Sequence, residues 1–476
     1  MGAWATERST RLGFLWQSLR FSAGALRPIA AAVALTVAGI STAVFAQVGD
    51  APLGGPRRWE AAMQVGPYGT LNVQTGRVLT TLDVVGWGGK GPAISFSLYH
   101  NMTSKWSAPG GTGLTMMGDV NGDDTVTTDD IDPFVDVMLS GDPTEEQLAV
   151  CDLDQSQGIG TDDALLLAEK LDRGSPCDPM WTHSYSSHLV FLTGSIKVVA
   201  DDGTEDVYPQ AGGSGNYSSP PGVFNTLQYI DASYPPRYIL TTKSQMKAEY
   251  STDGKLRHIY DPSGNTVTCY YITDAHDPAY GKLDYVEDAT GRTLDLVYNQ
   301  YAKLKQVKDA LPGADQRTWH LLYEDTLHPG TFSEDGDGYF RVLEDPMEYR
   351  IQWDYSACAE IAAISDKNGT PSPSNPVTRY YHSLVYTGGR LTLVRDPAPF
   401  TNQTQGFGYY TWQTTNQKTI YTDRRSYPWE FRFNGQSKNL VSTTDPLGHT
   451  QSFAYGDGRA PMIHEKTDHT NALNKT

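Results

Sequence analysis

The sequence is poor in cysteine and in basic residues, and it lacks the short motifs of several enzyme classes. Its 476 residues include four cysteines with no Cys-x-x-Cys spacing, which argues against a zinc site. It contains neither a Gly-x-x-x-x-Gly-Lys-[Ser/Thr] phosphate loop nor a Gly-x-Ser-x-Gly nucleophile turn. The 37 Lys and Arg residues face 55 Asp and Glu residues, and no basic stretch interleaved with aromatics suggests a nucleic acid partner. These absences favour a protein that is not an enzyme.

Long apolar runs are also scarce. The single candidate, residues 29–46, follows a region with four arginines and ends in Val44-Phe45-Ala46. This order is typical of an export signal, either cleaved as a signal peptide spanning residues 1–46 or retained as a signal anchor. We therefore predict a secreted or cell-surface protein with no membrane contact beyond this signal. Export permits disulfides, and Cys151, Cys177, Cys269 and Cys358 allow three pairings, of which Cys151–Cys177 is the first to test.

Two acidic twelve-residue loops, residues 119–130 and 152–163, end in the same Thr-Asp-Asp triplet. Calcium takes about six to eight oxygen ligands, which such a loop supplies from positions 1, 3, 5, 7, 9 and 12. In the first loop these positions hold Asp119, Asn121, Asp123, Thr125, Thr127 and Asp130. In the second they hold Asp152, Asp154, Ser156, Gly158, Gly160 and Asp163. The residues at position 7 would contribute backbone carbonyls, and a water would complete the second loop at Gly160. The alternative is a pair of solvated acidic turns, which would explain a single such loop equally well. Because two copies occur with the same spacing of ligand positions, we predict two Ca²⁺ sites.

Each loop leads into a helical pattern of apolar residues, beginning at Ile131 and at Leu165. The segment 116–176 therefore resembles a type I dockerin, and this resemblance implies docking onto a cohesin-like partner protein. Two departures from that pattern are present. Asp124 occupies the position where glycine normally permits the sharp turn, and Ser156 and Gly160 leave the second loop with fewer carboxylates.

The remainder of the chain, with 46 Gly, 28 Pro and 28 Tyr in the whole sequence, favours strands and turns. Beyond residue 250 it repeats the pattern Gly-x-Leu-x-x-Ile-x-Asp-x-x-Gly, with aromatic residues ending many of the predicted strands. Asp at position i with Gly at i+3 is typical of a type I turn, so each unit is predicted to be a β-hairpin that pairs with the next. The repeats are centred on Asp261, Asp288, Asp309, Asp345, Asp366, Asp396, Asp423, Asp445 and Asp468.

This pattern resembles the YD or RHS repeat family, whose sheets wind into a hollow β-shell. Segments such as 72–76, 89–92 and 181–185 are similar to the head that precedes these repeats. The resemblance implies a mostly β fold in which hairpin repeats form a curved or partial shell sheet, with a small α-helical calcium-binding insertion. The expected domains are a head in two parts, 47–115 and 177–249, the insert 116–176 between them, and repeats over 250–476. Because an insertion is tolerated in surface loops, we expect the insert to protrude.

Three functions are consistent with this organisation. The first is an exported, non-catalytic scaffold or surface interaction protein whose body contacts a glycan or a cell-surface ligand. The second, suggested because dockerins accompany such enzymes, is a part of extracellular polysaccharide degradation, as a glycoside hydrolase or a carbohydrate-binding accessory. The third is the N-terminal fragment of a toxin-delivery shell, since the last repeat stops before its return strand. The sequence His464-Glu465-Lys466-Thr467-Asp468-His469 nearly matches a zinc protease motif, but its histidines are spaced too far apart.

Overall fold

The structure of the protein is a computed structural model. It describes most of residues 62–101 and 181–455, short stretches between 105 and 167, and residues 466–470. The predicted export signal lies outside these ranges. No helix in the described part of the chain is long and apolar enough to span a membrane.

The head of the molecule is a five-stranded antiparallel sheet in the order β1-β2-β3-β4-β7. Its strands are β1 (Ala62–Val65), β2 (Gly69–Asn72), β3 (Val78–Trp87), β4 (Ile94–Asn101) and β7 (Trp181–His183). Between β4 and β7 come the short strands β5 (Lys105–Trp106) and β6 (Thr115–Met116) and the helix α4 (Ile131–Ser140). Because β4 pairs with β7 directly, with His100 opposite Trp181, the two ends of the intervening segment lie side by side.

The other strands form one antiparallel ladder in which strands that follow one another in sequence pair, except that β20 pairs with both β21 and β22. The first eight are β8 (His188–Leu192), β9 (Ser195–Val199), β10 (Glu205–Ala211), β11 (Asn216–Tyr217), β12 (Thr226–Ile230), β13 (Arg237–Thr241), β14 (Lys247–Ser251) and β15 (Leu256–Tyr260). The next eight are β16 (Thr266–Tyr271), β17 (Leu283–Glu287), β18 (Thr293–Tyr298), β19 (Leu304–Lys308), β20 (Thr318–Glu324), β21 (Phe332–Ser333), β22 (Phe340–Glu344) and β23 (Arg350–Tyr355), with a 3₁₀ turn at Gly313–Asp315. The last nine are β24 (Ile361–Ser365), β25 (Tyr381–Thr387), β26 (Arg390–Arg395), β27 (Phe407–Gln413), β28 (Lys418–Thr422), β29 (Pro428–Phe433), β30 (Leu440–Thr444), β31 (Thr450–Tyr455) and β32 (Lys466–Thr470).

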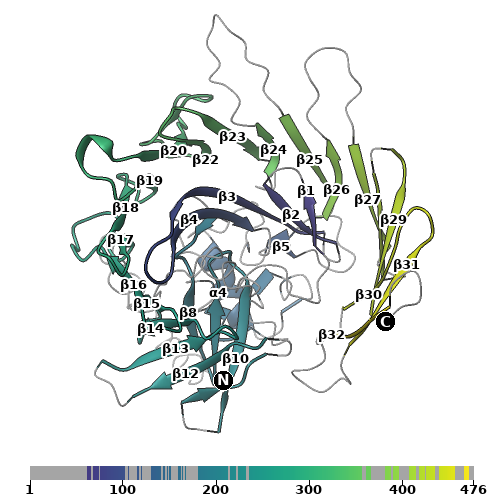
Figure 1. Ribbon diagram of the computed structural model, residues 1–476, viewed down its shortest axis with the longest axis horizontal. Helices are drawn as coiled ribbons and strands as arrows, with labels where there is room; N and C mark the ends of the chain where they lie inside the picture. The colour runs from purple at the N-terminus through teal and green to yellow at the C-terminus, as the bar shows by residue number, and fades with distance from the viewer. Residues whose placement is uncertain are drawn as a thin grey trace, which may run out of the picture.

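The ladder curves back on itself near its start. A bridge between His188 and Lys255 joins β8 to the β14–β15 turn, and Leu189 N donates to Gly254 O at 3.2 Å. From β16 onward the strands leave this ring and continue around a wide curve, and β3 and β4 run across its interior (Figure 1). The prediction of a mostly β fold built from hairpin repeats in a curved sheet is confirmed.

The hydrophobic core lies between the head sheet and the concave face of the ladder. Its largest cluster combines Phe96, Leu98 and Trp181 of the head with ladder residues such as Ile259 and Val286, all of them 0% exposed. A second cluster joins β1 to β3 with strands β25 to β29 through residues such as Leu71 and Leu391. The concave face is therefore covered by strands of the same chain in the part that the structure describes.

The repeat Asp residues fold the turns as predicted, by a local hydrogen-bonding pattern. At Asp261, the carboxylate Oδ1 accepts from the backbone N–H groups of Ser263 and Asn265, at 2.9 and 2.8 Å. Gly264 N donates to the Asp261 carbonyl at 3.0 Å, and Gly264 has φ +84°. The same pattern of backbone donors at i+2 and i+4 recurs at Asp288, Asp345, Asp423 and Asp445.

Two details of the repeat assignment change. Asp468 is not at a turn, because it lies in β32 and pairs with Ala454 of β31. Asn299 was not among the predicted centres, yet its Oδ1 accepts from Tyr301 N and Lys303 N in the same pattern. An amide oxygen therefore serves as well as a carboxylate at this position. The predicted centres Asp366 and Asp396 lie outside the described residues.

Tyrosine hydroxyls tie successive strands together on the concave side. The hydroxyls of Tyr271, Tyr298 and Tyr455 donate to the carbonyl oxygen of the leucine 15 residues earlier, at 2.7 to 2.8 Å. A register shift precedes each of these tyrosines, and it allows the ring to turn toward that carbonyl. The hydroxyl of Tyr323 donates in the same way to Leu304 O, at 2.6 Å. Lys303 Nζ lies 5.2 Å from the centroid of the Tyr323 ring.

We predict that Tyr323→Phe lowers the free energy of unfolding by about 1 kcal/mol, because it removes the hydroxyl donor to a buried carbonyl. Chemical denaturation monitored by Trp fluorescence measures this change. Tyr427→Phe is the matched control, since Tyr427 is 53% exposed. Equal stabilities of the two variants would contradict a stabilising role for the bond.

Candidate functional site

The residues that close the two predicted calcium loops, Asp130 and Asp163, occupy equivalent positions. Asp130 immediately precedes α4, and its Oδ1 accepts from Val120 N at 2.7 Å. Asp163 Oδ2 accepts from Gly160 N, also at 2.7 Å. The two residues are 0% and 1% exposed. Each carboxylate thus binds a backbone N–H within its own loop while buried, as a loop-closing metal ligand would be held.

Cys151 lies near both of these carboxylates. Burial, followed by the charges of Asp163 and Asp130, raises the pKa of the Cys151 thiol to about 12. The ends of the two loops therefore approach the same point in the insert. Cys151 is a free, buried cysteine, and Cys177, the first partner to test for it, lies outside the described residues. Cys269 is also free and buried.

The insert has a small hydrophobic core of its own, formed by Phe134, Val137, Val150, Cys151 and Leu167. Ile159, at position 8 of the second loop, packs against this core, as do Val190 and Leu192 of β8. The insert therefore contacts the ladder in addition to being joined to the head at its two ends. Its core shares contacts with β8, the first strand of the ladder.

The remaining predicted calcium ligands cannot be placed. Asp119, Asn121, Asp123, Thr125, Thr127, Asp152, Asp154, Ser156 and Gly158 lie outside the described residues. Among the residues that are described, no group of three or more His, Cys, Asp or Glu side chains could hold a metal ion. The donor set of Asp130 and Asp163, two buried carboxylates, suits a hard cation such as Ca²⁺. Calcium binding stays a prediction.

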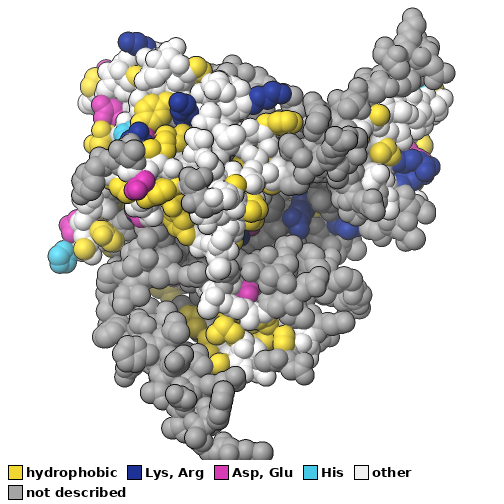
Figure 2. Space-filling view, turned by 90° about the horizontal axis from the view of Figure 1, so that it is seen from below, with side chains coloured by type: hydrophobic (Ala, Val, Ile, Leu, Met, Phe, Trp, Pro, Cys, Tyr) yellow, Lys and Arg dark blue, Asp and Glu magenta, His cyan; other side chains and the backbone are white. Residues whose placement is uncertain are grey.

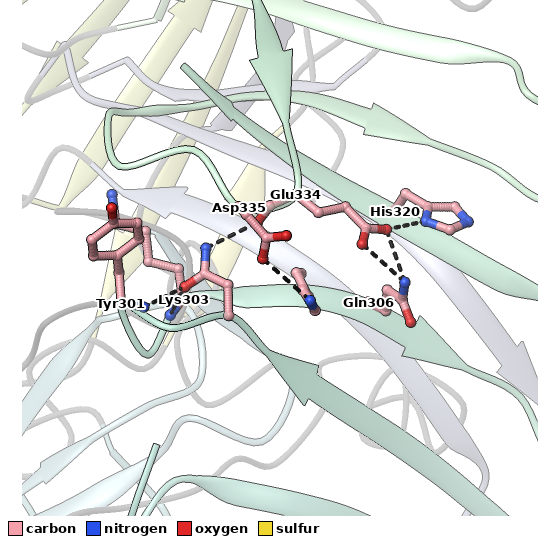
Figure 3. A network of polar contacts seen from close by, with 8 residues as sticks. Tyr301, Lys303, Gln306, His320, Glu334 and Asp335 are labelled. Carbon is pink, nitrogen blue, oxygen red and sulfur yellow. Dashed lines mark hydrogen bonds and ion pairs between the residues drawn. The ribbon is translucent and has the colours of Figure 1, made fainter. Parts of the chain in front are cut away.

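A separate network of polar side chains fastens the loop between β20 and β22 to the ladder. Figure 3 shows the Glu334 carboxylate between Gln306 and His320. Gln306 Nε2 donates to both Glu334 oxygens, at 2.9 and 3.0 Å, and His320 Nδ1 contacts Glu334 Oε1. Lys303 Nζ donates to the carbonyls of Asp337 and Gly338, at 2.8 and 2.6 Å. These contacts position a loop, and they bring no hydroxyl or thiol nucleophile to His320 among the interactions of the described chain.

Aromatic side chains lie on both faces of the ladder. Tyr250, Tyr323 and Trp353 are buried against the head, whereas Tyr270 is 37% exposed. The rings of Tyr270 and Tyr285 stack at 4.4 Å, with 14° between their planes. Hydrophobic and acidic side chains mix on the left of the face in Figure 2, the side on which β16 to β18 lie in Figure 1.

Two carboxylates accompany this stacked pair. Asp295 is directly opposite Tyr285 in the register of β17 and β18. Burial, followed by the charges of Asp295 and Asp277, raises the pKa of Asp284. The convex face thus combines exposed tyrosine rings with neighbouring carboxylates.

One repeat Asp also joins the ladder to the head, a role that the sequence pattern did not reveal. Trp87 Nε1 donates to Asp288 Oδ2 at 3.4 Å, and Arg292 both pairs with this carboxylate at 2.7 Å and donates to Gly88 O at 3.0 Å. Burial favours the neutral acid, but hydrogen bonds from Thr290 and Arg292 lower the pKa of Asp288 to about 2. The only sequence signal was an arginine four residues after the Asp.

The near match to a zinc protease motif does not form the required helix. Its described residues, 466–469, lie in the strand β32 (Lys466–Thr470), in which His469 pairs with Phe453. The zinc motif places its histidines on one face of a helix. Its first residues, His464 and Glu465, are outside the described residues.

No protein-family model and no curated protein matches the chain. Among solved structures, the Photorhabdus luminescens Tc holotoxin pore matches 85% of this chain and 18% of its own, with 11% identity and a TM-score of 0.30. The crystal structure of TcdB2-TccC3 without its hypervariable C-terminal region matches 57% of this chain and 16% of its own, with 13% identity and a TM-score of 0.29. The chain thus spans less than a fifth of these longer chains, and we base no conclusion on similarity at this level.

We predict that Asp288→Asn lowers the free energy of unfolding by about 2 kcal/mol near neutral pH, as expected for a pKa held near 2. Because the folded-state pKa is depressed, the stabilisation is present above the unfolded pKa and is lost as the pH falls through about 4 to 2. Denaturant titrations of both proteins over this range test the prediction. Asp445→Asn removes the equivalent carboxylate from a more exposed turn, so it should lower the free energy of unfolding by a smaller amount. A difference between wild type and Asp288→Asn that does not shrink in acid would contradict the assignment.

Proposed function

We propose that the protein is an exported, non-catalytic β-repeat scaffold that carries a calcium-stabilised docking insert. The observation that carries this proposal is the burial of Asp130 and Asp163, from two loops, around the same small core. Buried carboxylates are costly unless a positive charge or hydrogen bonds compensate them. Backbone N–H groups already donate to both carboxylates, and two Ca²⁺ ions would add positive charge, with Asp130 and Asp163 as loop-closing ligands.

The ladder supports the scaffold part of the proposal. Its repeat Asp side chains cap turns, its inward tyrosines bond strand carbonyls, and its concave face packs on the head. These are structural uses of residues that could otherwise have served as acids or bases. The surfaces available to partners in the described chain are then the convex face of the ladder and the insert.

The partner of the insert is proposed to be a cohesin-like protein. α4 offers an exposed residue for such a contact, since Leu139 is 51% exposed near the C-terminal end of the helix. Its buried side, Phe134 and Val137, faces the insert core. Calcium would act by holding the two loops and hence the helix in place.

A second candidate function is glycan binding on the convex face, as part of extracellular polysaccharide use. It is favoured by the exposed Tyr270, stacked on Tyr285, with Asp284 and Asp295 close by. Aromatic rings provide apolar platforms, and carboxylates accept hydrogen bonds from hydroxyl groups.

Removing calcium should reduce the helix content of the full-length protein. Without the ions, 16 acidic residues crowd the segment 116–176 and repel one another, so addition of EGTA should lower the helical signal in far-UV circular dichroism. Isothermal titration of the calcium-free protein with Ca²⁺ should give two binding events.

Paired variants make this test specific. Asp130→Asn should remove one binding event, whereas Asp132→Asn, an exposed position in the first turn of α4, should leave both. A spectrum unchanged by EGTA, together with no heat of Ca²⁺ binding, would refute the calcium proposal.

Glycan binding is tested by retention on insoluble polysaccharides. The Tyr270→Ala variant should lose at least about tenfold in affinity if a stacking contact worth about 1.4 kcal/mol is removed. Tyr427→Ala removes a more exposed tyrosine at a turn and should bind as wild type does. Equal retention of both variants would eliminate this face as the binding site.

A further inference from the structure

The turn between β9 and β10, residues 200–204, is buried at the root of the insert. Asp201 and Asp202 are both 0% exposed, which is unusual for two adjacent aspartates in a hairpin turn. Ala200 N donates to Thr204 O at 2.8 Å and Gly203 N donates to Ala200 O at 3.0 Å, so the backbone of the turn is closed. Gly203 has φ +82°, a conformation that favours glycine.

This turn holds both ends of the insert. Asn101, the last residue of β4, donates from Nδ2 to the Asp202 carbonyl at 2.7 Å. Thr182, in β7, donates from Oγ1 to the Asp201 carbonyl at 2.5 Å. The residues between Asn101 and Thr182 include the whole insert, so the two adjacent carbonyls bind the strand that enters it and the strand that leaves it.

The Asp202 side chain lacks full compensation in this buried place. Its Oδ1 accepts from Thr204 N at 3.0 Å, but its Oδ2 has no hydrogen-bond partner in the described part of the chain. Burial, which outweighs the hydrogen bonds from Thr204, raises the pKa of Asp202 to about 6, and the charge of Asp206 acts in the same direction.

The strands that flank or contact the turn carry other ionisable groups. Lys197 of β9 is paired with Glu205 of β10 at 2.9 Å. β4 contributes His100, and β7 contributes His183, which burial followed by the charge of Lys282 keeps neutral by lowering its pKa to about 3. Asp201 lies next to Asp202 in the turn. Lys197, the cation on β9, is thus engaged with another carboxylate.

We propose that the turn formed by residues 200–204 is a proton-sensitive clamp that closes the root of the insert more firmly when Asp202 is neutral. A protonated Asp202 removes an uncompensated charge from the interior and turns its carboxyl group into a possible donor. The carbonyls of Asp201 and Asp202 then keep Thr182 and Asn101 together. Ionisation of Asp202 favours opening of the turn toward water, which separates the two ends of the insert.

The direction of the pH effect follows from the raised pKa. The stabilisation of the closed clamp is complete below the ordinary pKa of about 4 and is lost as the pH rises through about 6. A difference of roughly two pH units changes the opening equilibrium by up to about 100-fold.

Hydrogen exchange of the full-length protein measures this opening directly. Peptides covering residues 98–101 and 181–185 are compared between wild type and Asp202→Asn at matched pH values from about 4.5 to about 7.5, so that intrinsic exchange rates cancel. The wild-type protein should gain about 10- to 100-fold in protection relative to the variant as the pH falls. Asp231→Asn, which neutralises an exposed carboxylate after β12, should behave as wild type does.

Two results would overturn the clamp. The first is a ratio of wild-type to Asp202→Asn exchange that stays constant with pH. The second is an Asp202 titration in wild type, followed by the ¹³C shift of selectively labelled aspartate, with a midpoint below about 4, the value of an ordinary carboxyl group. The second measurement decides the question even if the variant does not fold.

Discussion

The structure depends on one packing interface, between the head sheet and the concave face of the ladder. A single layer of hairpins has an apolar face that must be covered, because a hairpin alone is marginally stable in water. The head supplies Phe96, Leu98 and Trp181 to that face, and the ladder supplies inward residues from β8 to β24. The head and the repeats therefore stabilise each other, and neither is expected to keep its shape without its partner.

The same interface explains how the acidic and aromatic residues of the ladder are used. Inward tyrosines cannot bury a hydroxyl without a partner, and they find one in the carbonyl of the preceding strand. The repeat Asp residues lie at the turns, where backbone N–H groups from two and four residues later satisfy them. A count of carboxylates in the sequence therefore overstates the number available for chemistry.

The insert is more closely joined to the body than a tethered module would be. Its core contacts Val190 and Leu192 of β8, and its two ends meet at the turn formed by residues 200–204. Movement of the insert must therefore be accompanied by adjustment in the first strands of the ladder. This arrangement suits a scaffold that presents a docking element in a defined orientation, and a freely swinging attachment would not need it.

The hairpin repeats and their turn chemistry are predictable from the sequence, because both depend on residues a few positions apart. An Asp and the backbone groups that follow it within four residues form the same turn wherever they occur, and even Asn299 obeys this rule. The pattern failed at Asp468, where pairing with β31 placed the residue within a strand. For the candidate site, the spacing of the acidic loops predicted Asp130 and Asp163 as the loop-closing residues.

Three contacts come from the tertiary structure and not from any local pattern. Trp87 meets Asp288, the insert packs on β8, and Asp202 is buried at the root of the insert. Those contacts join distant segments through the curvature of the sheet, and no short sequence pattern encodes that curvature.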